Sequence, residues 1–368
     1  MIQSPSILLT IAAFLLVLGP LVVVHELGHY LVGRWFGVRA DVFSVGFGKE
    51  LWGRTDKRGT RWRIAALPLG GFVQFAGDMN AASMPDTTLS AAELKGTFQA
   101  APLWQRALIV LAGPVTNLLL AVAIFAGFNL IYGKAVVIPQ IAAFEAGAPA
   151  QAAGLKVGDR ILSVEGEAIA GFDDIRERIL PFPGRTVTII AQRGTQMLTF
   201  PVKIASRTDR DQFGNEARIG RIGVAAGATQ IIPVGPIEAV TLASEQCVGI
   251  VRMMVTGIGQ IVSGERSIKE LGGPIKIAKY SGEQLTLGWP QFVWFVALIS
   301  INLGFINLLP IPTLDGGHLA FYAAEAVRRK PVGLRSQEWA FRTGLAFVLA
   351  LMLFVTINDL MSLNLFGR

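Results

Sequence analysis

The sequence predicts a multi-pass α-helical membrane protein with four transmembrane helices, a β-hairpin region on the cytoplasmic side and one extracytoplasmic α+β domain. The 368 residues are 52% hydrophobic and only 16% charged, whereas soluble domains carry about 25% charged residues. Four apolar stretches are each close to the length of about 20 residues that is needed to cross the hydrocarbon core of a bilayer. Basic residues gather in the loops beside two of them, which is typical of cytoplasmic loops.

The predicted spans are residues 1–33, 106–132, 289–318 and 340–361. Between them we expect a cytoplasmic β region at 34–105, a folded domain at 133–206, an extracytoplasmic linker with amphipathic helices at 207–288, and a cytoplasmic loop at 319–339. A fifth apolar stretch, 239–261, is interrupted by Glu245, Gln246 and Arg252. It therefore fits an amphipathic helix at the membrane interface better than a span.

The basic residues orient the chain. The loop after the first span carries Arg34, Arg39, Lys49, Arg54, Lys57, Arg58, Arg61 and Arg63, and the loop after the third carries Arg328, Arg329, Lys330 and Arg335. By the positive-inside rule both loops are cytoplasmic. Both termini and residues 133–288 are then extracytoplasmic.

The first span contains the H-E-x-x-H pattern His25-Glu26-Leu27-Gly28-His29. Residues i and i+4 share a helix face, so His25 and His29 can hold one metal ion while Glu26 points toward a bound water. A buried histidine is usually a hydrogen-bonded core residue, but the chain has only 3 histidines and two of them are here. Ionisable residues in an apolar span are costly and generally functional. Zinc suits two imidazoles, a third protein ligand and one open position.

Asp315 is the predicted third ligand. His25 lies about 27 Å along the first helix from Ile7, at about 1.5 Å per residue, in the cytoplasmic part of the membrane. The third span runs in the same direction, so its end, just before Asp315, reaches a similar depth. If residues 239–261 crossed the membrane, the third span would reverse and this match would be lost.

Three further segments have a local interpretation. Residues 61–66 and 71–75 alternate like strands, and they form either a solvated hairpin or a sheet whose open edge pairs with an extended substrate. Gly113-Pro114 and Asn117 in the second span are as compatible with helix packing as with chemistry. Residues 207–220 are polar and read as a loop.

Three motifs together resemble the site-2 protease family of intramembrane zinc metalloproteases, in particular its bacterial RseP type. They are the H-E-x-x-H pattern, Asn307-x-x-Pro310-x-Pro312-x-x-Asp315-Gly316, and Gly113-Pro114-x-x-Asn117. The resemblance covers nearly the whole chain. Residues 148–164 are similar to a bacterial PDZ domain, which makes 133–206 a PDZ-like domain. Relatives of this type carry two tandem PDZ domains, whereas this chain has room for one.

The resemblance implies that His25, His29 and Asp315 bind Zn²⁺, that Glu26 is the base, and that Asn307 helps to hold the substrate or the oxyanion. His318 is left outside the ligand set, because three protein ligands already fill it. The implied activity is hydrolysis of a peptide bond within or near the transmembrane segment of a membrane protein, such as a single-pass anti-sigma factor, in regulated intramembrane proteolysis. The implied location is the bacterial inner membrane, with a peptide or a substrate ectodomain at the PDZ-like domain.

Other classes of protein fit the sequence less well. The net charge of +7 would suit nucleic acid, but the basic residues lie where membrane topology places them, so no nucleic-acid partner is expected. The single cysteine, Cys247, excludes an intramolecular disulfide and a cysteine-rich zinc site. A metal transporter would also bury His and Asp, but it would not need Glu26 between two ligands. A non-catalytic PDZ scaffold would need neither metal motif.

Overall fold

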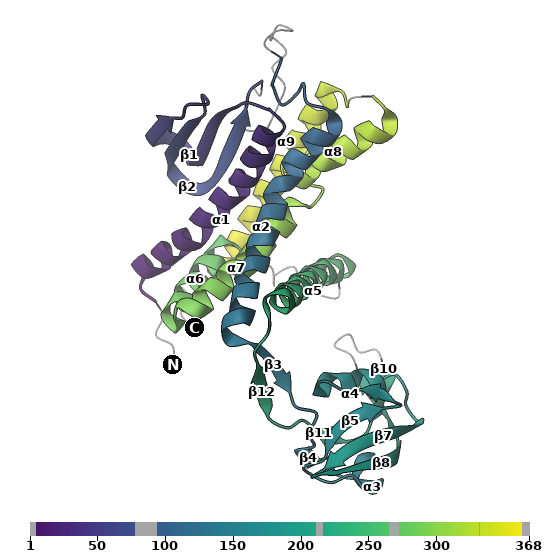
Figure 1. Ribbon diagram of the computed structural model, residues 1–368. Helices are drawn as coiled ribbons and strands as arrows, with labels where there is room; N and C mark the ends of the chain where they lie inside the picture. Colours follow the sequence, from purple (N-terminus) through teal and green to yellow (C-terminus); the bar gives the residue numbers. More distant parts are fainter. Residues whose placement is uncertain (1–4, 78–93, 211–215, 265–271, 331, 363–368) are drawn as a thin grey trace. The chain divides into compact units, whose positions relative to one another are not determined.

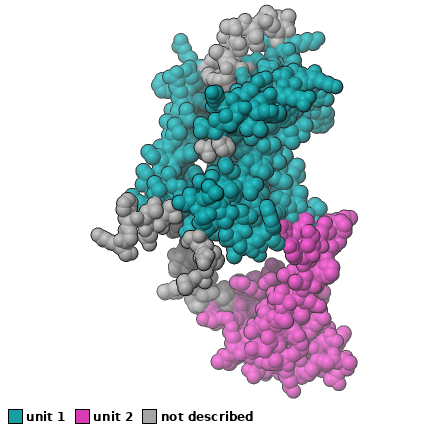
Figure 2. All heavy atoms as spheres, turned by 90° about the vertical axis from the view of Figure 1, so that its left-hand side faces the viewer, with its two compact units in different colours: residues 1–126, 240–368 teal, residues 127–239 magenta. Residues whose placement is uncertain are grey.

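The computed structural model describes residues 5–77, 94–210, 216–264, 272–330 and 332–362. The chain divides into two compact units (Figures 1 and 2). Unit 1 comprises residues 1–126 and 240–368, and unit 2 comprises residues 127–239.

Unit 1 is mainly helical. Its helices are α1 (Ile7–Trp35), α2 (Leu103–Tyr132), α5 (Pro236–Ser263), α6 (Pro274–Leu287), α7 (Trp289–Asn307), α8 (Asp315–Arg328) and α9 (Leu334–Ser362), of which α2 and α5 extend a few residues into unit 2. Within the described residues, α1, α2, α5, α7 and α9 are long and apolar enough to cross a membrane. The chain is therefore a multi-pass helical membrane protein, and the four predicted spans correspond to α1, α2, α7 and α9.

The helices pack through small and branched apolar side chains. Val17 and Leu21 of α1 form a buried cluster with Phe292 of α7. A second cluster joins Phe125 of α2 and Ile301 of α7 to one stripe of α5 that includes Ala243 and Cys247. Figure 1 shows α2 running beside α1 and α7, with α6 at the N-terminal end of α1. Residues 319–328, expected as part of a loop, continue α8 because their alanines, leucine and glutamate favour helix.

The β region follows α1. β1 (Ala40–Thr55) and β2 (Arg61–Phe75) form an antiparallel pair that folds back on itself, so that Val42, Phe43, Ser44 and Val45 each face two residues of β2. Tyr30 of α1 packs edge-on against Phe43 and Trp62. This aromatic contact seats the pair against the C-terminal half of α1 (Figure 1). The two expected strands at 61–66 and 71–75 belong to the single strand β2.

Unit 2 is an α+β domain around a four-stranded sheet in the order β6-β5-β7-β8. Its elements are β3 (Lys134–Val137), β4 (Ala143–Phe144), α3 (Pro149–Ala152), β5 (Arg160–Val164), β6 (Glu167–Ala168), α4 (Phe172–Ile179), β7 (Thr186–Arg193), β8 (Gln196–Lys203), β9 (Ala205–Arg210), β10 (Glu216–Arg221), β11 (Val224–Ala225) and β12 (Thr229–Ile232). Ile161, Ile189 and Val202 form its core with Ile175 of α4.

Unit 2 extends beyond the predicted end of the folded domain at residue 206. The segment expected as a loop carries β9 and β10, which pair with each other. β11 then pairs with β4, and β12 pairs with β3. The pairings of β11 and β12 join residues far apart in the sequence, so the local pattern of residues 224–232 does not reveal them.

Candidate metal centre

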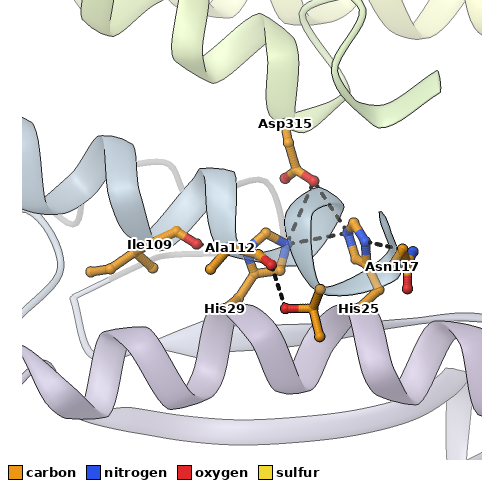
Figure 3. A network of polar contacts seen from close by, with 7 residues as sticks. His25, His29, Ile109, Ala112, Asn117 and Asp315 are labelled. Atoms are coloured by element: carbon orange, nitrogen blue, oxygen red, sulfur yellow. Dashed lines mark hydrogen bonds and ion pairs between the residues drawn. The ribbon is translucent and has the colours of Figure 1, made fainter. Parts of the chain in front are cut away.

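Three side chains that could hold a metal ion meet where α1 approaches the start of α8 (Figure 3). One ligand atom each from His25, His29 and Asp315 lies within 4.8 Å of the others. The Nε2 atoms of His25 and His29 are 3.2 Å apart. Asp315 Oδ2 lies 3.1 Å from His25 Nε2 and 3.5 Å from His29 Nε2. Within the described residues this is the one such group of three.

Local structure explains why these three side chains converge. The two histidines are four residues apart on α1 and therefore share a face. Asp315 is the first residue of α8, after a tight turn that follows α7. A Cβ atom on Gly316 would stand 2.3 Å from Leu308 O, and one on Gly317 would stand 2.3 Å from Ile311 O. Side chains at these two glycines would open the turn that carries Asp315.

The donor set fits zinc. Two imidazoles and one carboxylate leave a fourth position for water or substrate. The histidines are buried, at 7% and 9% exposure, and Asp315 Oδ2 is buried without a hydrogen-bond partner among the described residues. A buried anionic oxygen facing two imidazole nitrogens suits a shared cation.

Helix α2 provides the other contacts of both imidazole rings. His29 Nδ1 lies 2.8 Å from the carbonyl oxygen of Ile109, and His25 Nδ1 lies 3.2 Å from Nδ2 of Asn117 (Figure 3). A Cβ on Gly113 would stand 2.3 Å from His29 Nε2, and one on Gly28 would stand 2.6 Å from Ala112 O. The two glycines therefore let α1 and α2 cross at the metal centre.

Sequence reasoning left Asn117 undecided between packing and chemistry. Its side chain is fully buried in an apolar helix, and that combination is the signal that points to a role. The same reasoning missed the carbonyl of Ile109, which no side-chain pattern can reveal.

The remaining predicted residues lie outside the cluster of three. Glu26 is half-buried, and its carboxylate accepts a hydrogen bond from the backbone N–H of Val73 in β2. Asn307 is the half-buried last residue of α7, and the described contacts do not join its side chain to the three ligands. His318 is half-buried one turn into α8.

Residues 13–351 match peptidase family M50. A protein of Agrobacterium fabrum that is named as a zinc metalloprotease is 43% identical over 96% of this chain and 96% of its own length. A similarly named protein of Rhizobium meliloti is 45% identical over 95% of this chain and 96% of its own. Metalloprotease MmpA of Caulobacter vibrioides is 34% identical over 98% and 97%.

Among solved structures, the PDZ domain of an SdrC-like protein from Listeria monocytogenes covers 24% of this chain and 84% of its own length. Its sequence identity is 22% and its TM-score is 0.19.

Proposed function

The chain belongs to peptidase family M50 and is an intramembrane zinc metalloprotease, and we propose that it cuts single-pass membrane proteins of the anti-sigma-factor type within or near their transmembrane segment. The family membership confirms the resemblance seen in the sequence, and with it the zinc cofactor. In the proposed site His25, His29 and Asp315 hold the zinc ion and Glu26 is the base. The convergence of three ligand atoms within 4.8 Å carries this assignment.

The chain's own groups divide the work. His25, His29 and Asp315 would hold the zinc ion, which would supply Lewis-acid chemistry and lower the pKa of a bound water. Glu26 directly follows the ligand His25, so its carboxylate can take a proton from the attacking water and return it to the leaving amine. Asn307 ends α7 eight residues before Asp315. Its amide is proposed to donate a hydrogen bond to the substrate carbonyl or to the oxyanion.

A transmembrane substrate hides its carbonyl groups in helical hydrogen bonds, so it must unwind before it can be cut. The end of β2 that runs from Gly71 to Phe75 pairs on one side with β1 and lies beside α1. An extended substrate segment is proposed to lie along this strand, because main-chain pairing replaces the bonds that unwinding breaks.

Zinc content and proteolysis together test the site. His25→Ala, His29→Ala and Asp315→Ala should each lower the zinc content of the purified full-length chain sharply, because each removes a ligand. Glu26→Gln should keep its zinc and lose proteolysis, because it removes only the base. An active Glu26→Gln enzyme would contradict the mechanism.

Contacts within unit 1 support four spans rather than five. His29, near the end of α1, contacts Ile109, near the start of α2, so these helices run antiparallel. Asp315 follows α7 and meets the same histidine, so α7 runs in the direction of α1. An even number of crossings must then separate α2 from α7. Helix α6 has 14 residues, about 21 Å at about 1.5 Å per residue, and is too short to be the second crossing. Helix α5 is therefore proposed to lie at the interface.

The last helix agrees with this arrangement. A Cβ on Gly282 of α6 would stand 2.9 Å from Thr10 Oγ1, so α6 lies at the beginning of α1. Asp359, near the end of α9, accepts a hydrogen bond from the backbone N–H of Gly273, just before α6. Helix α9 thus ends on the side where α1 begins. With the basic loops inside, both termini are extracytoplasmic and the membrane is the bacterial inner membrane.

Cysteine labelling tests the topology in a Cys247→Ala background. Cysteines introduced as Lys57→Cys and Arg329→Cys should react with a thiol reagent from the cytoplasmic side only. A cysteine introduced as Asp209→Cys should react from the outside only. A reversed result at Arg329 alone would mean that α5 crosses the membrane.

Unit 2 is proposed to act as a PDZ-type filter for substrates. A groove of about 280 Å³ runs between α4 and residues 220–224, with Ile175, Ile179 and Ile222 in its lining. Such a groove suits an extended peptide added beside a strand. In the proposed topology it lies on the opposite side of the membrane from the zinc ligands, so it cannot take part in the chemistry. We favour exclusion of bulky ectodomains, because specificity often rests on rejecting wrong partners.

A deletion distinguishes exclusion from recruitment. Ile232 pairs with Lys134, so a short Gly-Ser linker can replace residues 134–232 without moving the ends apart. If unit 2 excludes, the deletion should cut full-length substrate as well as substrate whose ectodomain has been removed. Loss of cleavage of the trimmed substrate, with normal zinc content, would show that unit 2 recruits.

A further inference from the structure

We infer that Asn117 is a positioning residue of the zinc centre, and that its side-chain oxygen accepts a hydrogen bond from Nδ1–H of His25 when the metal is bound. The inference rests on the proposed assignment of His25, His29 and Asp315 as zinc ligands. Its starting point is the amide of Asn117, which is fully buried and lies 3.2 Å from His25 Nδ1.

The two imidazoles face the metal position with the same atom. Nε2 of both rings points at Asp315 Oδ2 (Figure 3). A neutral imidazole that offers Nε2 as a metal ligand carries its proton on Nδ1, and this N–H needs an acceptor. For His29 the acceptor is the carbonyl oxygen of Ile109 at 2.8 Å, which can only accept. The tautomer of His29 is thereby set for metal binding.

For His25 the corresponding partner is Asn117. In the structure, Nδ2 of the Asn117 amide faces His25 Nδ1. Its Oδ1 is buried and has no hydrogen-bond partner among the described residues. A half turn of the amide exchanges Oδ1 and Nδ2 and moves no other heavy atom. In either orientation of the Asn117 amide, the group that faces away from His25 has no hydrogen-bond partner among the described residues. The position of the proton on the His25 ring therefore determines which orientation is favoured. With Nε2 on the metal, only the oxygen can face Nδ1–H.

The backbone around Asn117 keeps the amide in place. Ser300 Oγ of α7 donates a 2.7 Å hydrogen bond to the carbonyl oxygen of Asn117. Thr116 Oγ1 donates to the carbonyl oxygen of Ala112 one turn earlier. Helix α2 thus presents both acceptors, Ile109 O and the Asn117 amide, to the two ligands of α1 while α7 braces it from the other side.

The test measures zinc affinity of the full-length chain in detergent by competition with a chelator. Asn117→Leu keeps the side-chain size and removes the acceptor, and it should weaken zinc binding about 10- to 100-fold, as loss of such a partner generally does. Asn117→Asp offers only acceptor oxygens and should bind zinc within a few-fold of wild type. Gly127→Ala lies on the same helix and its added methyl group meets nothing within 4 Å, so it should leave the affinity unchanged.

Cobalt gives a readout that loss of packing alone would not reproduce. The visible spectrum of the Co²⁺-loaded chain should be the same for wild type, Asn117→Asp and Gly127→Ala. It should be altered for Asn117→Leu, because the His25 ring is no longer held. If Asn117→Asp loses affinity as Asn117→Leu does, the amide donates to His25 and the inference is wrong. If Asn117→Leu binds as wild type does, it is wrong as well.

Two controls separate failure of this inference from failure of the proposed centre. His25→Ala removes a ligand and should abolish zinc binding, whatever Asn117 does. If wild type itself holds no zinc, or His25→Ala holds as much as wild type, the proposed ligand set fails. If Asn117→Leu does not fold, the comparison of Asn117→Asp with wild type still decides the orientation of the amide.

Discussion

Gly71 of β2 lies directly against Glu26 of α1. A Cβ atom on Gly71 would stand 3.2 Å from Glu26 Cγ and 2.7 Å from the carbonyl oxygen of Ser44. Two residues further along the strand, the backbone N–H of Val73 donates a hydrogen bond to the Glu26 carboxylate. The β region and the proposed base therefore pack directly against each other. The lack of a side chain at Gly71 provides the space for the Glu26 side chain.

Gly71→Ala should therefore reduce proteolysis at least about 10-fold while zinc content stays at the wild-type level. The added methyl group meets the backbone of Ser44, so β2 must shift, and the contacts of Glu26 with β2 shift with it. Overpacking of this kind costs about 1–3 kcal/mol. Activity and zinc content are measured on the same preparation. Gly19→Ala is the matched control on α1, because nothing lies within 4 Å of its added methyl group. Full activity of Gly71→Ala would mean that the contact with β2 is dispensable.

Gly113→Ala should weaken zinc binding, because its methyl group would stand 2.3 Å from His29 Nε2 and 2.9 Å from His25 Cε1. Helix α2 would have to move away from α1, and both rings would lose their partners on it. Chelator competition measures the change, which we expect to exceed about 10-fold. Gly127→Ala on the same helix meets nothing within 4 Å, and its affinity should equal that of wild type. Equal affinities for the two variants would contradict the close helix crossing.

Asp359 should hold the start of α6 against the end of α9. Its fully buried carboxylate accepts hydrogen bonds from the N–H groups of Gly273 and Lys276, at 3.0 and 3.1 Å, and Lys276 Nζ lies 3.5 Å away. Asp359→Ala should lower the free energy of unfolding by about 2 kcal/mol, since hydrogen bonds to charged groups contribute about 1.5–3 kcal/mol. Amide exchange at residues 273–276 should accelerate at least about 10-fold as that attachment is lost.

The control for this prediction is Glu338→Gln at the other end of α9. Glu338 forms an exposed pair with Arg342 at 2.6 Å, and such pairs contribute about 0–1 kcal/mol. Unchanged exchange at residues 273–276 in Asp359→Ala would show that the carboxylate does not secure α6.

The stability of unit 2 should depend on pH through Asp159. Its buried carboxylate receives two 2.8 Å hydrogen bonds from the Arg193 guanidinium. The side-chain hydrogen bonding with Arg193 holds the pKa of Asp159 below its usual value. A lowered folded pKa means that the stabilisation is present above the unfolded pKa of about 3.9 and is lost as pH falls through the folded value.

Asp159→Asn should accordingly lower the free energy of unfolding of unit 2 by about 2 kcal/mol at pH 7, and the difference from wild type should shrink below about pH 4. Hydrogen exchange in β5 and β7, corrected for the intrinsic pH dependence, measures it. Glu167→Gln removes an exposed pair with Arg178 and should change exchange little at any pH. A difference between wild type and Asp159→Asn that does not shrink as the pH is lowered would contradict the assignment.

Much of the site could be predicted from residues close together in the sequence. The helical repeat places His25 and His29 on one face of α1 whatever surrounds them. Hydropathy predicted four spans, and the direction of the third span predicted that Asp315 reaches the same depth as the histidines. The structure then brings the three ligand atoms together. The shared face of the two histidines could be predicted because helix geometry is the same for every chain. The four spans and their orientation stay predictions.

The contacts that complete the site required the tertiary structure. Ile109 O and Asn117 contact the two imidazoles only because α2 crosses α1 closely at Gly28 and Gly113. The position of that crossing cannot be predicted from the sequence pattern of either helix alone. The return of β12 to β3 was hidden for the same reason. Local sequence determines which element forms and which face it offers, whereas the partner of that face depends on packing and strand pairing between distant segments, whose free energy arises only once both are in place.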